Sequence, residues 1–168
     1  DSALREVDAV LHCAGPFVHT FRQMAEACLR TKRHYVDISG EIPGFEALAA
    51  MDNQAREAGV MLLPGAGFNV VPSDCLAVHL KKRMPEARRL ALACAGFGRV
   101  SRGTATTAIE GLGRTGLVRR GGVLTPVPSA WKTRRIDFGE GPRTAVTIPL
   151  GDLSTAWRTT NVGDITTY

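Results

Sequence analysis

The sequence predicts a parallel, doubly wound α/β sheet over residues 1–85, followed by an α+β part over residues 86–168. Three observations lead to this prediction. Short apolar segments alternate with helical patterns three times before Pro85. The connections between them are short and contain Gly and Pro. After Arg88 the alternation gives way to a longer apolar strand and hairpin-like segments. Regular alternation of strand and helix is typical of a parallel sheet.

Length and composition indicate a globular protein without a membrane segment. The chain has 168 residues, of which 44% are hydrophobic and 22% charged. This suffices for one substantial core but not for two complete enzyme domains. No apolar run approaches the roughly 20 residues that cross a bilayer. The N-terminus has neither the basic start nor the apolar stretch of a signal peptide. We therefore expect a cytoplasmic protein that does not bind membranes.

Residues 7–17 predict the first strand, because an apolar run ends there at Gly15-Pro16, as in a strand buried on both faces. A helix should follow, since Thr20 and Gln23 form a capping-box pattern. Apolar residues then recur along one helical face, namely Phe21, Met24, Ala25 and Cys28.

Two more strand–helix pairs complete the first half. Residues 34–39 predict a strand, and residues 43–58 predict one helix that stops at Gly59. Residues 60–64 predict a third buried strand, and a third helix follows from Pro72.

The second half predicts antiparallel pairing. Residues 89–97 are expected to form a long strand and residues 104–112 a helix. Residues 117–128 contain a Gly-Gly turn between two apolar runs, which favours a hairpin. Residues 144–149 predict a further strand. We place the domain boundary near Pro85.

Two glycine-rich segments bear on nucleotide binding. Residues 111–116 spell G-x-G-x-x-G, but a helical pattern precedes them and a hairpin follows, the reverse of the context that a dinucleotide loop needs. We interpret them as turn and helix-end glycines. Residues 65–67 follow a strand and precede a helix, so they fit either a loop that approaches a ligand with bare backbone or a plain turn.

Three strand ends are expected at one edge of the sheet. The loop after the first strand contains Gly15 and Phe17, the loop after the second contains Gly40 and Glu41 beside Asp37, and the third begins at Gly65. Open α/β sheets bind ligands at this carboxyl edge. Phe17 fits an apolar ligand wall and a core position equally well.

Other chemistries find little support. There is no G-x-S-x-G elbow and no HExxH motif, which disfavours hydrolases. The four cysteines and four histidines are scattered, so we expect no structural metal and reduced, buried thiols.

Positive charge is concentrated in residues 88–135, which contain ten Lys or Arg and one acid, Glu110. This segment fits a solvated surface or a site for acidic ligands. Nucleic acid is disfavoured because few aromatic residues lie between the arginines. The cations expected to attract an acidic substrate or carrier partner are Arg102, Arg114, Arg119, Arg120, Lys132, Arg134 and Arg135.

Residues 15–29, 34–41 and 62–80 resemble the saccharopine dehydrogenase-like oxidoreductases, including the trans-acting enoyl reductase branch, and residues 101–111 and 131–152 extend the resemblance. It implies the C-terminal part of a Rossmann-type dinucleotide-binding domain over 1–85. It also implies part of an α+β substrate or dimerisation domain over 86–168. The chain would then be an internal fragment, with the Gly-rich cofactor segment upstream of Asp1.

The resemblance further implies NADP or NAD as cofactor and a homodimer. It names no catalytic residue. The implied cofactor-binding residues are Cys13, Ala14, Gly15, Pro16, Phe17, Gly40, Glu41, Gly65, Gly67 and Phe68. The implied substrate residues are Arg102, Lys132 and Arg134.

The leading functional hypothesis is hydride transfer to an unsaturated, carbonyl or imine substrate that carries an acidic group, either as a small molecule or bound to a carrier. The alternative is a non-catalytic binding or assembly module that retains the oxidoreductase scaffold. We expect the isolated chain to be inactive, because it lacks the fingerprint segment that supplies much of the cofactor affinity.

Overall fold

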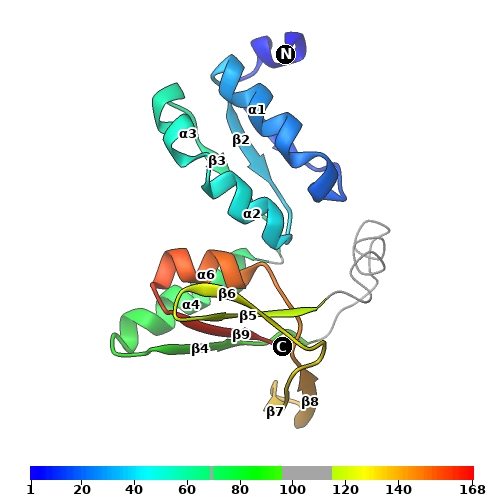
Figure 1. Cartoon of the computed structure of the whole chain (residues 1–168), viewed down its shortest axis with the longest axis vertical. Helices are drawn as coiled ribbons and strands as arrows, with labels where there is room; N and C mark the ends of the chain where they lie inside the picture. The colour runs from blue at the N-terminus through cyan, green and yellow to red at the C-terminus, as the bar shows by residue number, and fades with distance from the viewer. Residues whose placement is uncertain (69, 96–114) are drawn as a thin grey trace. The chain divides into compact units, whose positions relative to one another are not determined.

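The structure of the chain falls into two compact units. A computed structural model describes residues 1–68, 70–95 and 115–168. The compact units are residues 1–72 and residues 73–168 (Figure 1). Most of helix α4 (Val71–Arg83) thus groups with the second unit, whereas the predicted domain boundary near Pro85 would place it in the first. The domains 1–85 and 86–168 stay a prediction, since a compact unit need not coincide with a domain.

The first unit contains a three-stranded sheet in the order β1-β2-β3. Its strands are β1 (Ala9–His12), β2 (His34–Asp37) and β3 (Leu62–Leu63). Both neighbouring pairs are parallel, so the carboxyl ends of all three strands meet at one edge. The predicted parallel sheet is therefore confirmed.

Helices connect the strands of this sheet. They are α1 (Phe21–Thr31), α2 (Ile42–Ala49) and α3 (Asp52–Ala58), with short 3₁₀ turns η1 (Ser2–Glu6) and η2 (Phe17–His19). The prediction of one helix over residues 43–58 is wrong, because the chain turns at Ala50 and Met51. This break allows the Met51 side chain to be buried. The predicted stop at Gly59 is confirmed, with a φ of +68° that suits glycine.

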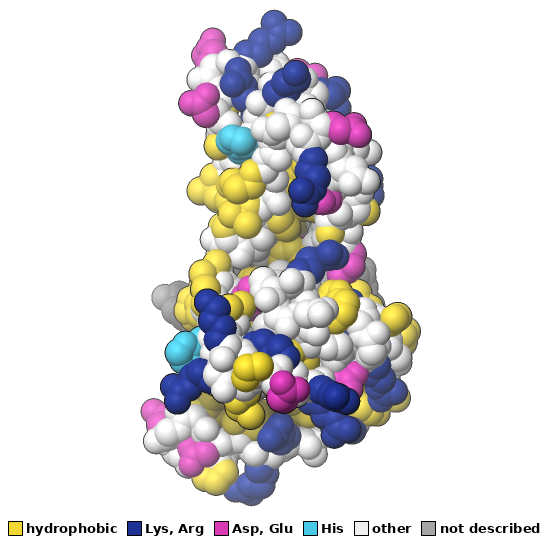
Figure 2. Space-filling view, turned by 90° about the vertical axis from the view of Figure 1, so that its left-hand side faces the viewer, with side chains coloured by type: hydrophobic (Ala, Val, Ile, Leu, Met, Phe, Trp, Pro, Cys, Tyr) yellow, Lys and Arg dark blue, Asp and Glu magenta, His cyan; other side chains and the backbone are white. Residues whose placement is uncertain are grey.

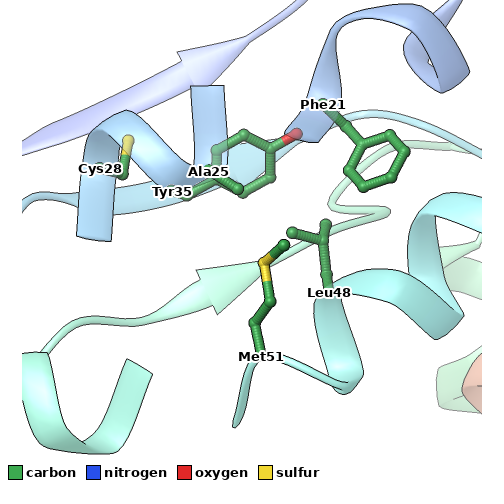
Figure 3. Close-up of a cluster of buried hydrophobic side chains, with 6 residues drawn as sticks. All are labelled: Phe21, Ala25, Cys28, Tyr35, Leu48 and Met51. Atoms are coloured by element: carbon green, nitrogen blue, oxygen red, sulfur yellow. The ribbon is translucent and has the colours of Figure 1, made fainter. Parts of the chain in front are cut away.

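The core of the first unit lies between α1, α2 and β2. Figure 3 shows six buried side chains that meet there: Phe21, Ala25, Cys28, Tyr35, Leu48 and Met51. The spacing of apolar residues in α1 predicted this face, and Met24 packs against the cluster as a partly buried neighbour. Burial of large apolar side chains is the main favourable contribution to the stability of such a unit.

The opposite face of the same sheet is apolar and exposed. Register places Leu11, Val36 and Leu63 next to one another across the three strands, on the face opposite Tyr35. Leu11 is 63% exposed and Leu63 is 44% exposed. The prediction that the first strand is buried on both faces is therefore wrong for the part of the chain that the structure describes.

The second unit contains a four-stranded mixed sheet in the order β4-β9-β5-β6. Its strands are β4 (Arg89–Leu92), β9 (Asp164–Thr167), β5 (Gly116–Arg120) and β6 (Val123–Val127). The predicted hairpin is confirmed: β5 and β6 are antiparallel and turn at Gly121 and Gly122, both at positive φ. The predicted strand 89–97 ends early, at Leu92, and the predicted helix 104–112 lies outside the described residues.

Two helices and a separate ribbon complete the second unit. Helix α6 (Asp152–Thr160) lies beside α4, and the Thr159 hydroxyl donates to the Asp74 carboxylate at 3.1 Å (Figure 1). Strands β7 (Thr133–Asp137) and β8 (Pro142–Val146) form a two-stranded antiparallel sheet of their own. The strand predicted at 144–149 corresponds to β8, whereas β7, α6 and β9 were not predicted.

The first turn of α6 buries a carboxyl group. Asp152 is fully buried, and neither carboxylate oxygen has a hydrogen-bond partner of ordinary geometry among the described residues. Burial raises the pKa of Asp152, and the nearby Asp74 adds to this effect, although interaction with Ser73 and with the backbone opposes it. Because the folded-state pKa is raised, the carboxyl group stabilises the fold only while it is protonated.

We predict that Asp152→Asn stabilises the second unit at neutral and alkaline pH. The contribution of Asp152 is fully present below its unfolded-state pKa and is lost as the pH rises through its folded-state pKa. The variant should therefore be more stable than the wild type by about 1 kcal/mol at pH 8, since a buried amide costs less than a buried charge. The difference should shrink toward pH 4, as measured by urea unfolding.

The control is Asp52→Asn, which changes an exposed aspartate in the first turn of α3 that binds Arg56 at 2.8 Å. That change should lower stability slightly at pH 8, the opposite sign. Equal effects of the two substitutions, or a loss of stability in Asp152→Asn at pH 8, would contradict the interpretation of Asp152.

Candidate functional site

The three loops that follow β1, β2 and β3 are joined by hydrogen bonds at the carboxyl edge of the first sheet. This convergence was predicted from the parallel order of the strands. Two carboxylates make most of the connections: Asp37 at the end of β2 and Glu41 four residues later. Asp37 connects the end of β2 to the loop after β3, and Glu41 connects the loop after β2 to the loop after β1.

Asp37 ties the end of β2 to the loop after β3. It is fully buried and accepts hydrogen bonds from the Tyr35 hydroxyl at 2.7 Å, the Ser39 N–H at 2.9 Å and the Gly65 N–H at 2.8 Å. Its own carbonyl accepts the Ala66 N–H at 2.7 Å. Burial raises the pKa of Tyr35, and the hydrogen bond to Asp37 adds to the rise, so the phenol stays a donor.

Glu41 ties the loop after β2 to the loop after β1. Its two carboxylate oxygens accept the backbone N–H groups of Phe17 at 3.0 Å and Val18 at 2.6 Å. Hydrogen bonds to an ionised acceptor are stronger than neutral ones. Glu41 was predicted to bind the cofactor; in the structure its carboxylate holds the Gly15–Phe17 loop in place.

The loop after β1 is also fastened to the start of α1. The Thr20 hydroxyl donates to the Ala14 carbonyl at 2.8 Å and lies 2.9 Å from His12 Nε2. Thr20 does precede α1, but its side chain makes no capping hydrogen bond, so the predicted capping box is wrong. The His12 ring in turn meets the Phe17 ring edge-on at 5.5 Å between centroids.

Three of the predicted glycines are explained by close packing. A Cβ on Gly65 would lie 2.9 Å from the Phe45 ring, and Gly65 has a φ of +75°. A Cβ on Gly67 would lie 3.1 Å from Ile38, and one on Gly15 would lie 3.3 Å from the Phe17 ring. The backbone at these positions can lie this close to its neighbours only because the glycines have no side chain.

Surface remains open at this edge for a flat ligand. Cys13, Ala14 and Gly15 are exposed, Pro16, Phe17 and Gly40 are partly buried, and Phe68 is 89% exposed. Bare backbone and aromatic faces at the carboxyl edge of a parallel sheet fit a dinucleotide in the part of its site formed by these loops.

The cations predicted to attract an acidic substrate belong to the second unit. Lys132, Arg134, Arg135 and Arg120 are exposed, and Lys and Arg side chains are prominent on the face of this unit that Figure 2 shows. Arg119 does not fit the prediction, because it is only 4% exposed and donates to the carbonyls of Leu153 and Gly122. Arg102 and Arg114 lie outside the described residues.

Two other predictions concern glycines and cysteines. Residues 111–114 of the G-x-G-x-x-G segment lie outside the described residues, and Gly116 opens strand β5. The expectation of buried cysteines holds for Cys28 alone: its thiol is free and buried, and burial raises its pKa. Cys13, Cys75 and Cys94 are exposed.

Asp37 was predicted to lie at this edge, but its hydrogen bonds with Tyr35, Ser39 and Gly65 were not predicted. The spacing Asp-x-Ser at the end of a strand is the signal that could have predicted the Asp37–Ser39 turn. The His12–Thr20 contact has no comparable signal in the sequence.

Within the described residues, no helix combines the length and hydropathy that a bilayer crossing requires.

Comparisons with known proteins find similar sequences for part of the chain. The family model described as the saccharopine dehydrogenase NADP binding domain matches residues 1–63. A curated trans-acting enoyl reductase from Mycobacterium leprae (strain TN) is 31% identical over 80 residues, which is 47% of this chain and 19% of that protein.

A solved structure shares the fold. It is apo histidine-tagged saccharopine dehydrogenase (L-Glu forming) from Saccharomyces cerevisiae, with a TM-score of 0.59 at 14% identity, over 99% of this chain and 41% of that one. This likeness confirms the predicted Rossmann-type α/β fold. The chain thus spans less than half of the length of either relative.

The loops that these carboxylates hold together fall largely within the segment that matches the NADP-binding domain. Residues 1–63 are thus similar to the saccharopine dehydrogenase NADP binding domain, and the chain as a whole shares its fold with a saccharopine dehydrogenase.

Proposed function

We propose that this chain is part of an enzyme that transfers hydride between NADPH or NADH and an unsaturated, carbonyl or imine substrate. The observation that carries the proposal is the set of three loops joined by Asp37 and Glu41 at the carboxyl edge of β1, β2 and β3. Ligands of open α/β sheets bind at this edge. A nicotinamide cofactor supplies or accepts the hydride when it is bound.

The residues of the chain divide into two roles in this proposal. Cys13, Ala14, Gly15, Pro16 and Phe17, with Gly40 and Phe68, contact the cofactor through backbone and aromatic surface. Glu41, Gly65 and Gly67 act by holding the loops, because their groups are engaged by neighbouring protein atoms. We assign no catalytic residue, since positioning of cofactor and substrate accounts for most of the protein's part in hydride transfer.

The substrate is proposed to carry an acidic group, either free or on a carrier, that is attracted by Arg102, Lys132 and Arg134. The excess of positive charge in residues 88–135 supports this part of the proposal. A homodimer is proposed on the resemblance alone.

We predict that the gene product containing residues 1–168 binds NADPH or NADH saturably, at a single site. The measurement is titration of reduced-nicotinamide fluorescence, followed by a turnover assay with unsaturated and carbonyl acids. Absence of binding by both cofactors in a folded protein would favour the alternative, a binding or assembly module that keeps the oxidoreductase scaffold.

We predict that Gly15→Val in that gene product weakens NADPH binding about tenfold, or about 1.4 kcal/mol. A Cβ added at this position would lie 3.3 Å from the Phe17 ring, so the larger side chain displaces Phe17 and crowds the exposed backbone. The matched control is Gly44→Ala, whose Cβ would meet Phe21 at an ordinary 3.8 Å and which should leave affinity unchanged. Unchanged affinity in Gly15→Val with a cooperative melt would contradict the assignment.

We predict that Glu41→Gln loosens the loop after β1. The amide keeps one acceptor oxygen where the carboxylate has two, so Phe17 and Val18 lose their charge-assisted bonds. Amide hydrogen exchange at these two residues should accelerate about five- to tenfold. Glu57→Gln, an exposed residue of α3 with the same loss of charge, should leave both exchange rates as they are. Equal exchange in the two variants would show that Glu41 does not position the loop.

A further inference from the structure

We propose that Arg120, Trp131 and Lys132 form an anion-binding cluster that takes a phosphate or carboxylate group of a small ligand. The proposal rests on the proposed function in one respect, since the ligand would be the acidic group of the substrate. It adds Trp131 to the residues considered so far and places Arg120 and Lys132 together at its ring.

The cluster joins two segments that are separate in the sequence. Arg120 is the last residue of β5, and Lys132 immediately precedes β7. The Arg120 guanidinium carbon lies 4.7 Å from the centroid of the Trp131 ring, and the Lys132 ammonium nitrogen lies 4.1 Å from the same centroid. Cation–π attraction therefore gathers two positive charges at one indole.

These two cations have no acidic partner within 4 Å among the described residues. The carboxylates of the β7–β8 ribbon lie at its far end from Lys132 and are engaged there. Glu140 pairs with Arg143, and Asp137 accepts the N–H groups of Gly139 and Gly141. Asp164, opposite the β5–β6 turn, accepts the Gly121 N–H. The charge of the cluster is thus left for an external anion.

The backbone under the cluster is fixed. The Lys132 N–H donates to the Thr147 hydroxyl, and the Lys132 carbonyl accepts both that hydroxyl and the Thr147 N–H at 2.9–3.0 Å. Thr147 is only 3% exposed. Ala130, next to Trp131, has a φ of +50°, a left-handed conformation that is unfavourable for alanine. Strained residues of this kind are frequent at ligand-binding positions, and a fixed backbone lowers the entropic cost of binding.

The chemistry of the two side chains fits a compact anion. Arginine offers a planar fork of donors that matches phosphate and carboxylate, and lysine adds a point charge. Both cations lie over the indole, so the ring serves as their support and is a poor stacking platform for nucleic-acid bases. A small anion is therefore favoured over a nucleic acid.

The test uses Trp131 as its own reporter, since the chain has only two tryptophans. Inorganic pyrophosphate and succinate are titrated into the 168-residue chain at constant ionic strength while tryptophan fluorescence is followed. We expect a saturable change with half-saturation at about 1–10 mM for at least one of the two, as for a single weak site. Trp131→Phe should abolish the change, and comparison of the two anions distinguishes a phosphate from a carboxylate ligand.

Charge-matched variants separate the cluster from general attraction. Arg120→Ala with Lys132→Ala should weaken binding at least tenfold while the thermal melt is unchanged. The control is Lys82→Ala with Arg83→Ala, which removes the same charge from exposed residues at the end of α4 and should bind like the wild type.

Equal weakening in both double variants, or no saturable change with either anion, would overturn the proposal. A mixed-sequence single-stranded oligonucleotide that binds through Trp131 more tightly than about 10 µM would also overturn it, in favour of a nucleic-acid surface. The assay contains no cofactor. A failure to bind NADPH in the gene product would therefore contradict the oxidoreductase proposal without changing the anion result.

Discussion

A buried carboxylate, Asp37, is the group on which the carboxyl edge of the first sheet depends. It is fully buried, and it receives donors from its own strand, from the turn after it and from the loop after β3. A buried charge is tolerated only when its hydrogen-bonding capacity is met. The positions of Ser39 and Gly65 are therefore set by the need of Asp37 for donors, and Gly65 must lack a side chain to come close enough.

The second unit also contains a buried charged side chain whose hydrogen bonds must be satisfied, in this case an arginine. Arg119 is buried, and its guanidinium donates to the carbonyls of Leu153 in α6 and Gly122 in the β5–β6 turn, beside the Trp157 ring. A strand, a turn and a helix are thus fixed by one side chain. Arg119 was predicted among the surface cations because charge alone does not reveal which arginine of a pair is buried. In β5 Arg119 is buried and Arg120 is exposed.

Periodicity was sufficient for the elements with a strong local pattern. The face of α1, the parallel strands and the Gly121-Gly122 hairpin were all predicted from spacing and turn chemistry. The strands β7 and β9 were not, because TRRID and DITT carry too few apolar residues for a clear pattern, and their pairing depends on distant partners. The same limit applies to the site: the loops could be placed at one edge, but the long-range bonds of Glu41 to Phe17 and Val18 could not.

The exposed apolar row formed by Leu11, Val36 and Leu63 has a practical consequence for laboratory work with these residues alone. An exposed apolar row of this kind promotes association between protein molecules, and Ile38 and Met61 are exposed as well. A preparation limited to residues 1–168 should fluoresce with a hydrophobic dye while still folded and should lose solubility at high concentration. Dye binding by such a preparation would therefore be a property of the native sheet and should not be taken as a sign of a molten globule.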